Sequence, residues 1–225
     1  WTDPNACGVK NALRVVDFCI QEAGFLYVKM NPAQNHYPID GPDVLAVLDR
    51  IVELGGIPAF HFGADTKFTP AEGMEAIAKR HPSHPVLAVH MGGGGASYVE
   101  GENLSMRARR LGLEHPNVRF ALSAKRDTHM ESDLITYQLA GEPFRHNLFC
   151  ASDAPYGRMA WNFGGFRAML RSLMAGERHT DKRVRENPGL FTAKSAQDYL
   201  GGSFARFTVE GYARLLGVQC MALQS

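Results

Sequence analysis

Three side chains that can bind a metal or move a proton come at the ends of apolar runs in this sequence: His61, His90 and Asp153. A neutral imidazole in apolar surroundings is a good ligand for a divalent ion. A carboxylate in such a place is costly unless it is paired, hydrogen-bonded or bound to a cation. Beside a cation it could hold the ion and also accept a proton from water. These residues therefore indicate metal-assisted acid-base chemistry.

Each of the three residues also has a purely structural explanation. A single histidine of this kind is more often hydrogen-bonded inside a core, and Asp153 could cap a helix that begins near Tyr156. The second histidine favours the chemical interpretation, because two histidines at matching positions of adjacent parallel strands lie within reach of one ion.

Three further polar residues are candidates for contacting a substrate. Lys29 could anchor a substrate carboxylate, balance the charge of Asp153 or pair with a neighbouring acid. Arg126 and His129 follow the apolar run that ends at Ser123, in a segment that we expect to be a loop above the same edge. A run of mixed charge is also typical of a solvated loop, so both interpretations of this segment stay open.

The elements that would position these residues alternate along the chain. Short, continuous apolar runs are typical of strands buried in a parallel sheet, and they occur at 25–30, 57–62, 85–91, 118–123 and 147–153. Helical spacing occurs between them and at both ends of the chain, at 10–22, 44–54, 74–78, 104–113, 134–139, 156–174 and 204–216. The alternation predicts parallel strands joined by crossover helices.

The polar strand ends recur at a constant interval. Lys29, His61, His90, Ser123 and Asp153 are separated by 32, 29, 33 and 30 residues, about the length of one strand-helix unit. A (β/α)8 barrel places functional residues at the carboxyl end of every strand, whereas a doubly wound sheet concentrates them at one switch point. The sequence therefore predicts an α/β fold of the TIM-barrel type. Residues 1–225 would form a single, partial barrel domain that covers roughly strands 4–8 and a C-terminal helical tail.

Composition excludes several classes of protein. The 24 basic and 23 acidic residues are nearly balanced and form no charged block, which argues against nucleic acid as a partner. Every apolar run is much shorter than the roughly 20 residues of a membrane span. Four scattered cysteines, Cys7, Cys19, Cys150 and Cys220, form no CxxC pair, and no leader peptide is recognisable. We expect free thiols in a cytoplasmic protein.

Four segments, taken in order, resemble the amidohydrolase-related metal-dependent hydrolases over residues 10–175: 24–29, 57–63, 87–93 and 151–155. The resemblance implies a (β/α)8 barrel with one divalent metal ion, zinc in the first place and manganese or magnesium as alternatives. It implies that His61 and Asp153 are metal ligands, that His90 is an acid or base, and that Lys29 lies on the fourth strand. The HxH pair that the family carries on its first strand is missing from this sequence.

The leading hypothesis is a hydrolase in which Asp153 and His90 activate a metal-bound water. The water would attack a carbonyl, amide or lactone of a small organic acid whose carboxylate is held by Lys29 or Arg126. A non-oxidative decarboxylase is the close alternative, and a catalytically silent barrel fragment that only binds a ligand or partner is an alternative of another class. The expected partner is a small-molecule substrate, with no nucleic acid and no membrane, and a homo-oligomer stays open.

Overall fold

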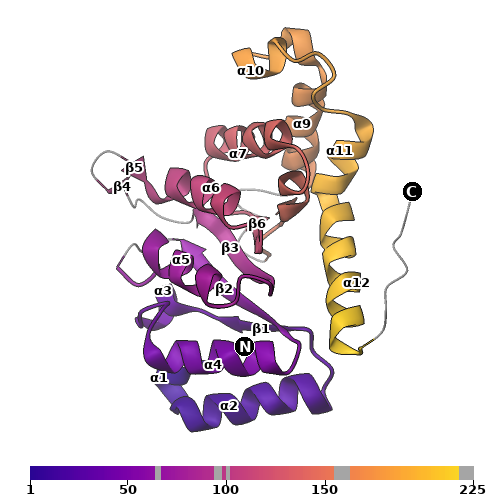
Figure 1. Ribbon diagram of the computed structural model, residues 1–225. Helices are drawn as coiled ribbons and strands as arrows, with labels where there is room; N and C mark the ends of the chain where they lie inside the picture. The colour runs from indigo at the N-terminus through magenta and orange to yellow at the C-terminus, as the bar shows by residue number, and fades with distance from the viewer. Residues whose placement is uncertain (64–66, 94–97, 100–101, 155–162, 218–225) are drawn as a thin grey trace.

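A five-stranded parallel sheet forms the centre of the molecule (Figure 1). The computed structural model describes residues 1–63, 67–93, 98–99, 102–154 and 163–217. The sheet has the order β1 (Tyr27–Met30), β2 (Ile57–Gly63), β3 (Val86–Gly93), β6 (Val118–Leu122) and β7 (Leu148–Cys150). A small antiparallel pair, β4 (Tyr98–Val99) and β5 (Glu102–Asn103), lies between β3 and β6 in the chain. Neighbours in the sheet therefore follow each other along the sequence.

Helices precede, connect and follow these strands. The connecting helices are α4 (Pro42–Glu53), α5 (Ala71–Arg80), α6 (Leu104–Glu114) and α7 (Asp127–Ala140). Before β1 come α1 (Pro4–Cys7), α2 (Val9–Asp17) and a π-helical turn (Phe18–Glu22), and the short α3 (Pro32–Asn35) follows β1. After β7 come α9 (Phe163–Met174), α10 (Lys182–Arg185), α11 (Ala193–Gln197) and α12 (Ser203–Leu215). Turns of 3-10 helix span Phe144–Asn147 and Gly176–Arg178, and a second π-helical turn spans Asp198–Gly202.

The sequence of α4 shows why such a helix forms where it does. Pro42 begins the helix, where its fixed φ is already helical and its missing N–H is not needed. Val44, Val47, Leu48 and Ile51 follow at helical spacing and are all buried, so one face of the helix packs on the sheet.

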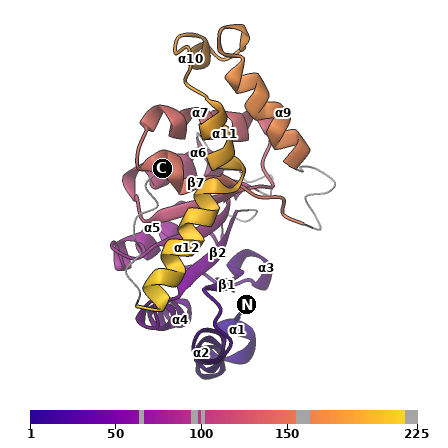
Figure 2. The ribbon, with the colours of Figure 1, turned by 90° about the vertical axis from the view of Figure 1, so that its right-hand side faces the viewer.

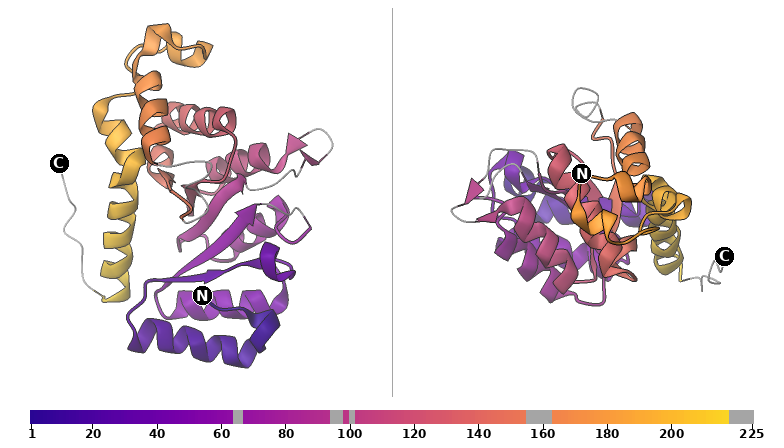
Figure 3. Two further views of the ribbon diagram at one scale, coloured as in Figure 1. Left: turned by 180° about the vertical axis from the view of Figure 1, so that it is seen from behind. Right: turned by 90° about the horizontal axis from the view of Figure 1, so that it is seen from above.

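Alternate strand residues belong to two apolar clusters on opposite faces of the sheet. In β2, Phe60 and Phe62 pack in the larger cluster with the connecting helices, whereas Ile57 and Ala59 belong to a smaller cluster with Phe207 of α12. The connecting helices α4 to α7 all contribute to the larger cluster and so share one face (Figure 3).

This one-sided helix layer distinguishes two parallel-sheet architectures. A doubly wound sheet carries crossover helices on both faces, while a barrel carries them only on the outside. The fold is therefore an α/β arrangement consistent with part of a TIM-barrel-like structure. The assignment of these strands as the fourth to eighth of a barrel stays a prediction.

Helix α12 crosses the amino ends of the strands (Figure 2). A Cβ atom added at Gly211 would lie 2.7 Å from Leu26 and 2.9 Å from Ile57, which shows how closely the helix approaches the start of the sheet. The hydroxyls of Tyr27 and Thr208 are 2.8 Å apart and form a hydrogen bond. The carboxyl ends of the strands lie on the other side, away from α12.

Several expected boundaries are corrected by the structure. The segment after Ser123 is not a loop throughout, because α7 begins at Asp127 and contains His129; an acidic residue in the first turn suits the positive end of the helix dipole. Strand β7 ends at Cys150, so Asp153 lies three residues beyond the strand. Helix α9 covers Phe163–Met174 of the helix predicted at 156–174, and the earlier part lies outside the described residues.

Two expectations about the class of protein can be compared with the described residues. Within those ranges no helix combines the length and the apolar character that crossing a bilayer requires. Cys7, Cys19 and Cys150 are free thiols, and Cys220 lies outside the described residues.

We predict that Gly112→Ala destabilises the fold. A Cβ atom at this position of α6 would collide with the hydroxyl of Tyr137 and the ring of Phe120, both buried. Overpacking of this kind costs about 1–3 kcal/mol, which urea unfolding would measure. Glu114→Ala, at an exposed position of the same helix, should change the free energy of unfolding by less than about 0.5 kcal/mol; equal effects of both substitutions would contradict the packing argument.

Candidate active site

His61 and His90 lie near the carboxyl ends of β2 and β3, and Asp153, three residues after the end of β7, lies beside them. The ring centroids of the two histidines are 4.5 Å apart, with their planes at 64°. Nε2 of His90 lies 3.9 Å from Oδ1 of Asp153. The regular interval between polar strand ends predicted that these three residues lie close together, and they do. Their catalytic and metal-binding roles stay predictions.

A change of register between β2 and β3 brings the two histidines to the same place. His61 pairs with Val89, but Gly63 pairs with Gly93, so β3 contains two extra residues in this stretch. Side chains alternate between faces along a regular strand, and His90 would then point away from His61. A positive φ of 76° at His90 breaks the alternation and turns its ring toward the site.

Left-handed backbone is concentrated at this edge of the sheet. Four of the five described non-glycine residues with positive φ lie in the second half of β3 or shortly after β6 and β7: His90 (76°), Met91 (48°), Ala124 (49°) and Asp153 (51°). Such a conformation costs of order 1 kcal/mol or more per residue and persists where surrounding contacts impose it, often at functional sites. The geometry of the edge is therefore maintained by its surroundings.

Burial keeps both imidazoles neutral near pH 7. It lowers the pKa of His61 to about 4, with smaller contributions from His90 and Lys29 in the same direction, while Asp153 opposes the shift. Burial also lowers the pKa of His90 to about 4, and the charge of Lys29 adds to this effect. A neutral imidazole can bind a metal or accept a proton.

Ser123 is a member of the site to which the sequence assigned no role. Its hydroxyl lies 2.8 Å from Nδ1 of His90, and the residue is 1% exposed. This hydrogen bond orients the ring so that Nε2 faces Asp153. The signal that could have identified Ser123 is its place in the regular interval of polar strand ends.

Lys29 joins the site from β1. Half-burial lowers the pKa of its ammonium, and the charge of Asp153 opposes this shift. Of the roles left open for Lys29, charge balance with Asp153 therefore has direct electrostatic support. Binding of a substrate carboxylate stays a prediction.

The other two substrate-binding candidates lie at the start of α7. Arg126 is exposed and immediately precedes the helix. Burial lowers the pKa of His129, and among the charges that act on it the charge of Lys125 adds most to this shift while that of Asp133 opposes it. The structure thus brings Lys29, His61, His90 and Asp153 together, whereas a substrate contact by Arg126 or His129 stays a prediction.

The donor atoms of His61 and Asp153 suit a divalent ion, since imidazole nitrogen and carboxylate oxygen are common ligands of zinc and manganese. In the part of the chain that the structure describes, however, no group of three or more His, Cys, Asp or Glu side chains is placed to enclose an ion. The two residues therefore fit a part of a coordination sphere and not a complete one. The identity of the metal stays a prediction.

Comparison with known proteins gives one match. A family model described as Amidohydrolase matches residues 6–170, which is more than half of the chain and includes Lys29, His61, His90 and Asp153. A search of curated proteins and a search of solved structures gave no match.

We predict that the chelator-treated protein loses stability as the pH falls from about 6.5 toward 4. The unfolded chain takes up protons on His61 and His90 near their ordinary pKa of about 6.5, whereas the folded chain does so only near 4. More protons are then bound by the unfolded state across this window, so acidification favours unfolding.

Urea unfolding at pH 7, 6 and 5 would measure this loss. The double variant His61→Gln, His90→Gln should show a flatter dependence on pH, because it lacks both groups. An unchanged dependence in the double variant would mean that these two histidines do not cause the loss.

Proposed function

Because the chain belongs to the amidohydrolase family, whose general activity is metal-dependent hydrolysis or decarboxylation, we propose that it is a hydrolase of small organic carboxylates that contain a carbonyl, amide or lactone group. The observation that supports this proposal most is the arrangement of a neutral, buried His90 whose Nε2 lies 3.9 Å from Asp153, with His61 beside it. A candidate base (His90), a carboxylate (Asp153) and a side chain of a type that commonly binds metal ions (His61) thus lie together at one edge of the sheet.

His61 and Asp153 would hold the metal ion, with further ligands from outside this pair. When bound, a divalent ion supplies positive charge that lowers the pKa of water and polarises a carbonyl. The low pKa of His61, about 4, leaves its nitrogen lone pair free for such an ion at neutral pH.

Proton transfer falls to Asp153 and His90. The carboxylate of Asp153 would accept a proton from the attacking water. Nε2 of His90 faces that carboxylate and would take up this proton and pass it to the leaving group, while the hydrogen bond between Nδ1 and the hydroxyl of Ser123 keeps the ring in place. Groups positioned in this way are typical of general acid-base catalysis.

Lys29 would bind the carboxylate of the substrate. Its ammonium is half-buried and near Asp153, and a charge pair at reduced exposure to water is stronger than one in bulk solvent. Arg126 is the alternative contact, from the start of α7.

Non-oxidative decarboxylation at the same site is the second candidate. The burial that lowers the pKa of both histidines also disfavours a charged carboxylate on a bound substrate, which is the group that decarboxylation removes. Both candidates use the same four residues and differ in the product.

The test is turnover by the chelator-stripped chain resupplied with Zn²⁺ or Mn²⁺, assayed on lactones and amides that bear a carboxylate and on hydroxybenzoates. We expect His90→Gln to lower kcat by about 10²–10⁴. We expect His61→Ala to lose both turnover and bound metal, measured by elemental analysis. His115→Ala, which removes a histidine between α6 and β6 at the opposite end of the sheet, should change neither.

The products separate the remaining possibilities. Release of carbon dioxide would assign the decarboxylase, and ring opening or amide cleavage would assign the hydrolase. A folded chain that binds no metal and turns over none of these compounds would overturn the proposal in favour of a catalytically silent fragment.

A further inference from the structure

A buried ion pair lies next to the site and has no part in the chemistry described above. Nζ of Lys125 is 2.5 Å from Oδ2 of Asp133, and both side chains are completely buried. The other carboxylate oxygen of Asp133 accepts a hydrogen bond from Nε of Arg109 at 2.6 Å. The carboxylate of Asp133 therefore pairs with two cations, Lys125 and Arg109. The ammonium of Lys125 has further N–H groups that can donate to another partner.

The second partner of Lys125 is the turn that carries His90. Nζ of Lys125 donates a hydrogen bond to the carbonyl oxygen of Met91 at 2.9 Å. Met91 follows His90 directly, and both have left-handed backbone. A Cβ atom added at Gly93 would collide with the side chain of Lys125, so the lysine also packs against the backbone of this turn.

The segment after β6 thus contacts both the ring of His90 and the backbone that follows it. Ser123 contacts the ring through Nδ1, and Lys125 holds the following carbonyl. Ala124 between them has a φ of 49°, which interrupts the regular alternation of side chains along this segment.

We propose that Lys125, fixed by Asp133, is a positioning residue that keeps residues 90–93 in the conformation that directs His90 toward Asp153. Only the kinetic consequence rests on the proposed function. The structural part concerns the backbone of the turn and stands independently of any reaction.

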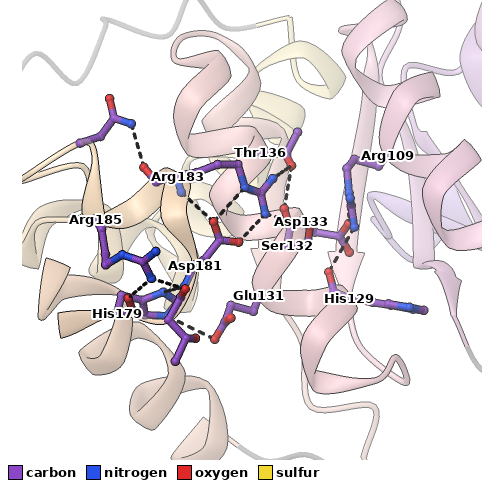
Figure 4. Close-up of polar contacts among 12 residues, drawn as sticks. Arg109, His129, Glu131, Ser132, Asp133, Thr136, His179, Asp181, Arg183 and Arg185 are labelled. Atoms are coloured by element: carbon purple, nitrogen blue, oxygen red, sulfur yellow. Dashed lines mark hydrogen bonds and ion pairs between the residues drawn. The ribbon is translucent and has the colours of Figure 1, made fainter. Parts of the chain in front are cut away.

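The alternative is an ion pair that stabilises the fold without affecting the turn. Figure 4 shows Asp133 on α7 beside Arg109 of α6, while Ser132 and Thr136 of the same helix contact Arg183 of α10. Arg109 donates to Asp133 and to the carbonyl of His129, whereas Lys125 donates to Asp133 and to Met91. Arg109→Met is therefore a matched control, because it removes the other cation that is hydrogen-bonded to the carboxylate of Asp133. It leaves the hydrogen bond from Lys125 to Met91 in place.

The experiment compares Lys125→Met with Arg109→Met in the full chain, by crystallography and by amide hydrogen exchange. In Lys125→Met we expect His90 and Met91 to leave the left-handed region, and the amides of Gly92 and Gly93 to exchange about tenfold faster or more. Arg109→Met should keep the turn and its exchange rates. The same turn and the same rates in both variants would overturn the proposal.

Kinetics supply a second comparison. If the chain turns over a substrate, Lys125→Met should lower kcat by about tenfold or more, because a small displacement of a catalytic group is costly, with KM changed by less than about threefold. Arg109→Met should keep kcat. Equal kcat values in the two variants would contradict the positioning role.

Two controls keep the result decisive. If Lys125→Met does not fold, Lys125→Gln takes its place with the same expectations, because its shorter amide cannot make the ion pair and the bond to Met91 together. If the unaltered chain shows no turnover at all, the proposed function fails, and the crystallographic and exchange comparison still decides the role of Lys125.

Discussion

Parallel alignment of five strands that follow each other along the chain is the constraint on which the candidate site depends. Because all five strands pair in parallel, each strand starts at the edge crossed by α12 and ends at the opposite edge. Residues that are about 30 positions apart in sequence thereby become neighbours. His61 and His90 meet across adjacent strands, and Asp153 reaches them from β7 across β6.

The chemistry of this edge follows from its burial. Imidazole rings that are removed from water lose their protons more readily, so His61 and His90 are neutral at a pH at which exposed histidines begin to be protonated. Burial also requires contacts that hold the polar groups in place. Ser123 and Lys125 provide these contacts from one short segment, to the ring of His90 and to the backbone that follows it.

The described residues offer two candidate metal ligands and no complete metal site. The family match covers the four residues of the strand edge, yet the described residues place no three metal-binding side chains around one point, and the sequence contains no HxH pair. His61 and Asp153 stay predicted ligands, which together would supply part of a coordination sphere.

The sequence by itself determined the order of the elements and the positions of the polar strand ends. The apolar runs predicted all five sheet strands, and helical spacing over 44–54 predicted α4. The regular interval pointed to Lys29, His61, His90 and Asp153 as polar residues near the strand ends. These are local patterns of period and composition, which a sequence displays directly.

Only the tertiary structure decided how His90 enters the site. Its left-handed backbone and the change of register in β3 lie where Ser123 and Lys125 form hydrogen bonds with the ring of His90 and the carbonyl of Met91. Both partners are more than 30 positions away in sequence and become adjacent only after the sheet has formed. The start of α7 at Asp127 was missed for a similar reason, because its mixed charges look like a solvated loop until Asp133 is seen to be buried between Arg109 and Lys125. Contacts between distant segments override local preference, and a local pattern cannot contain them.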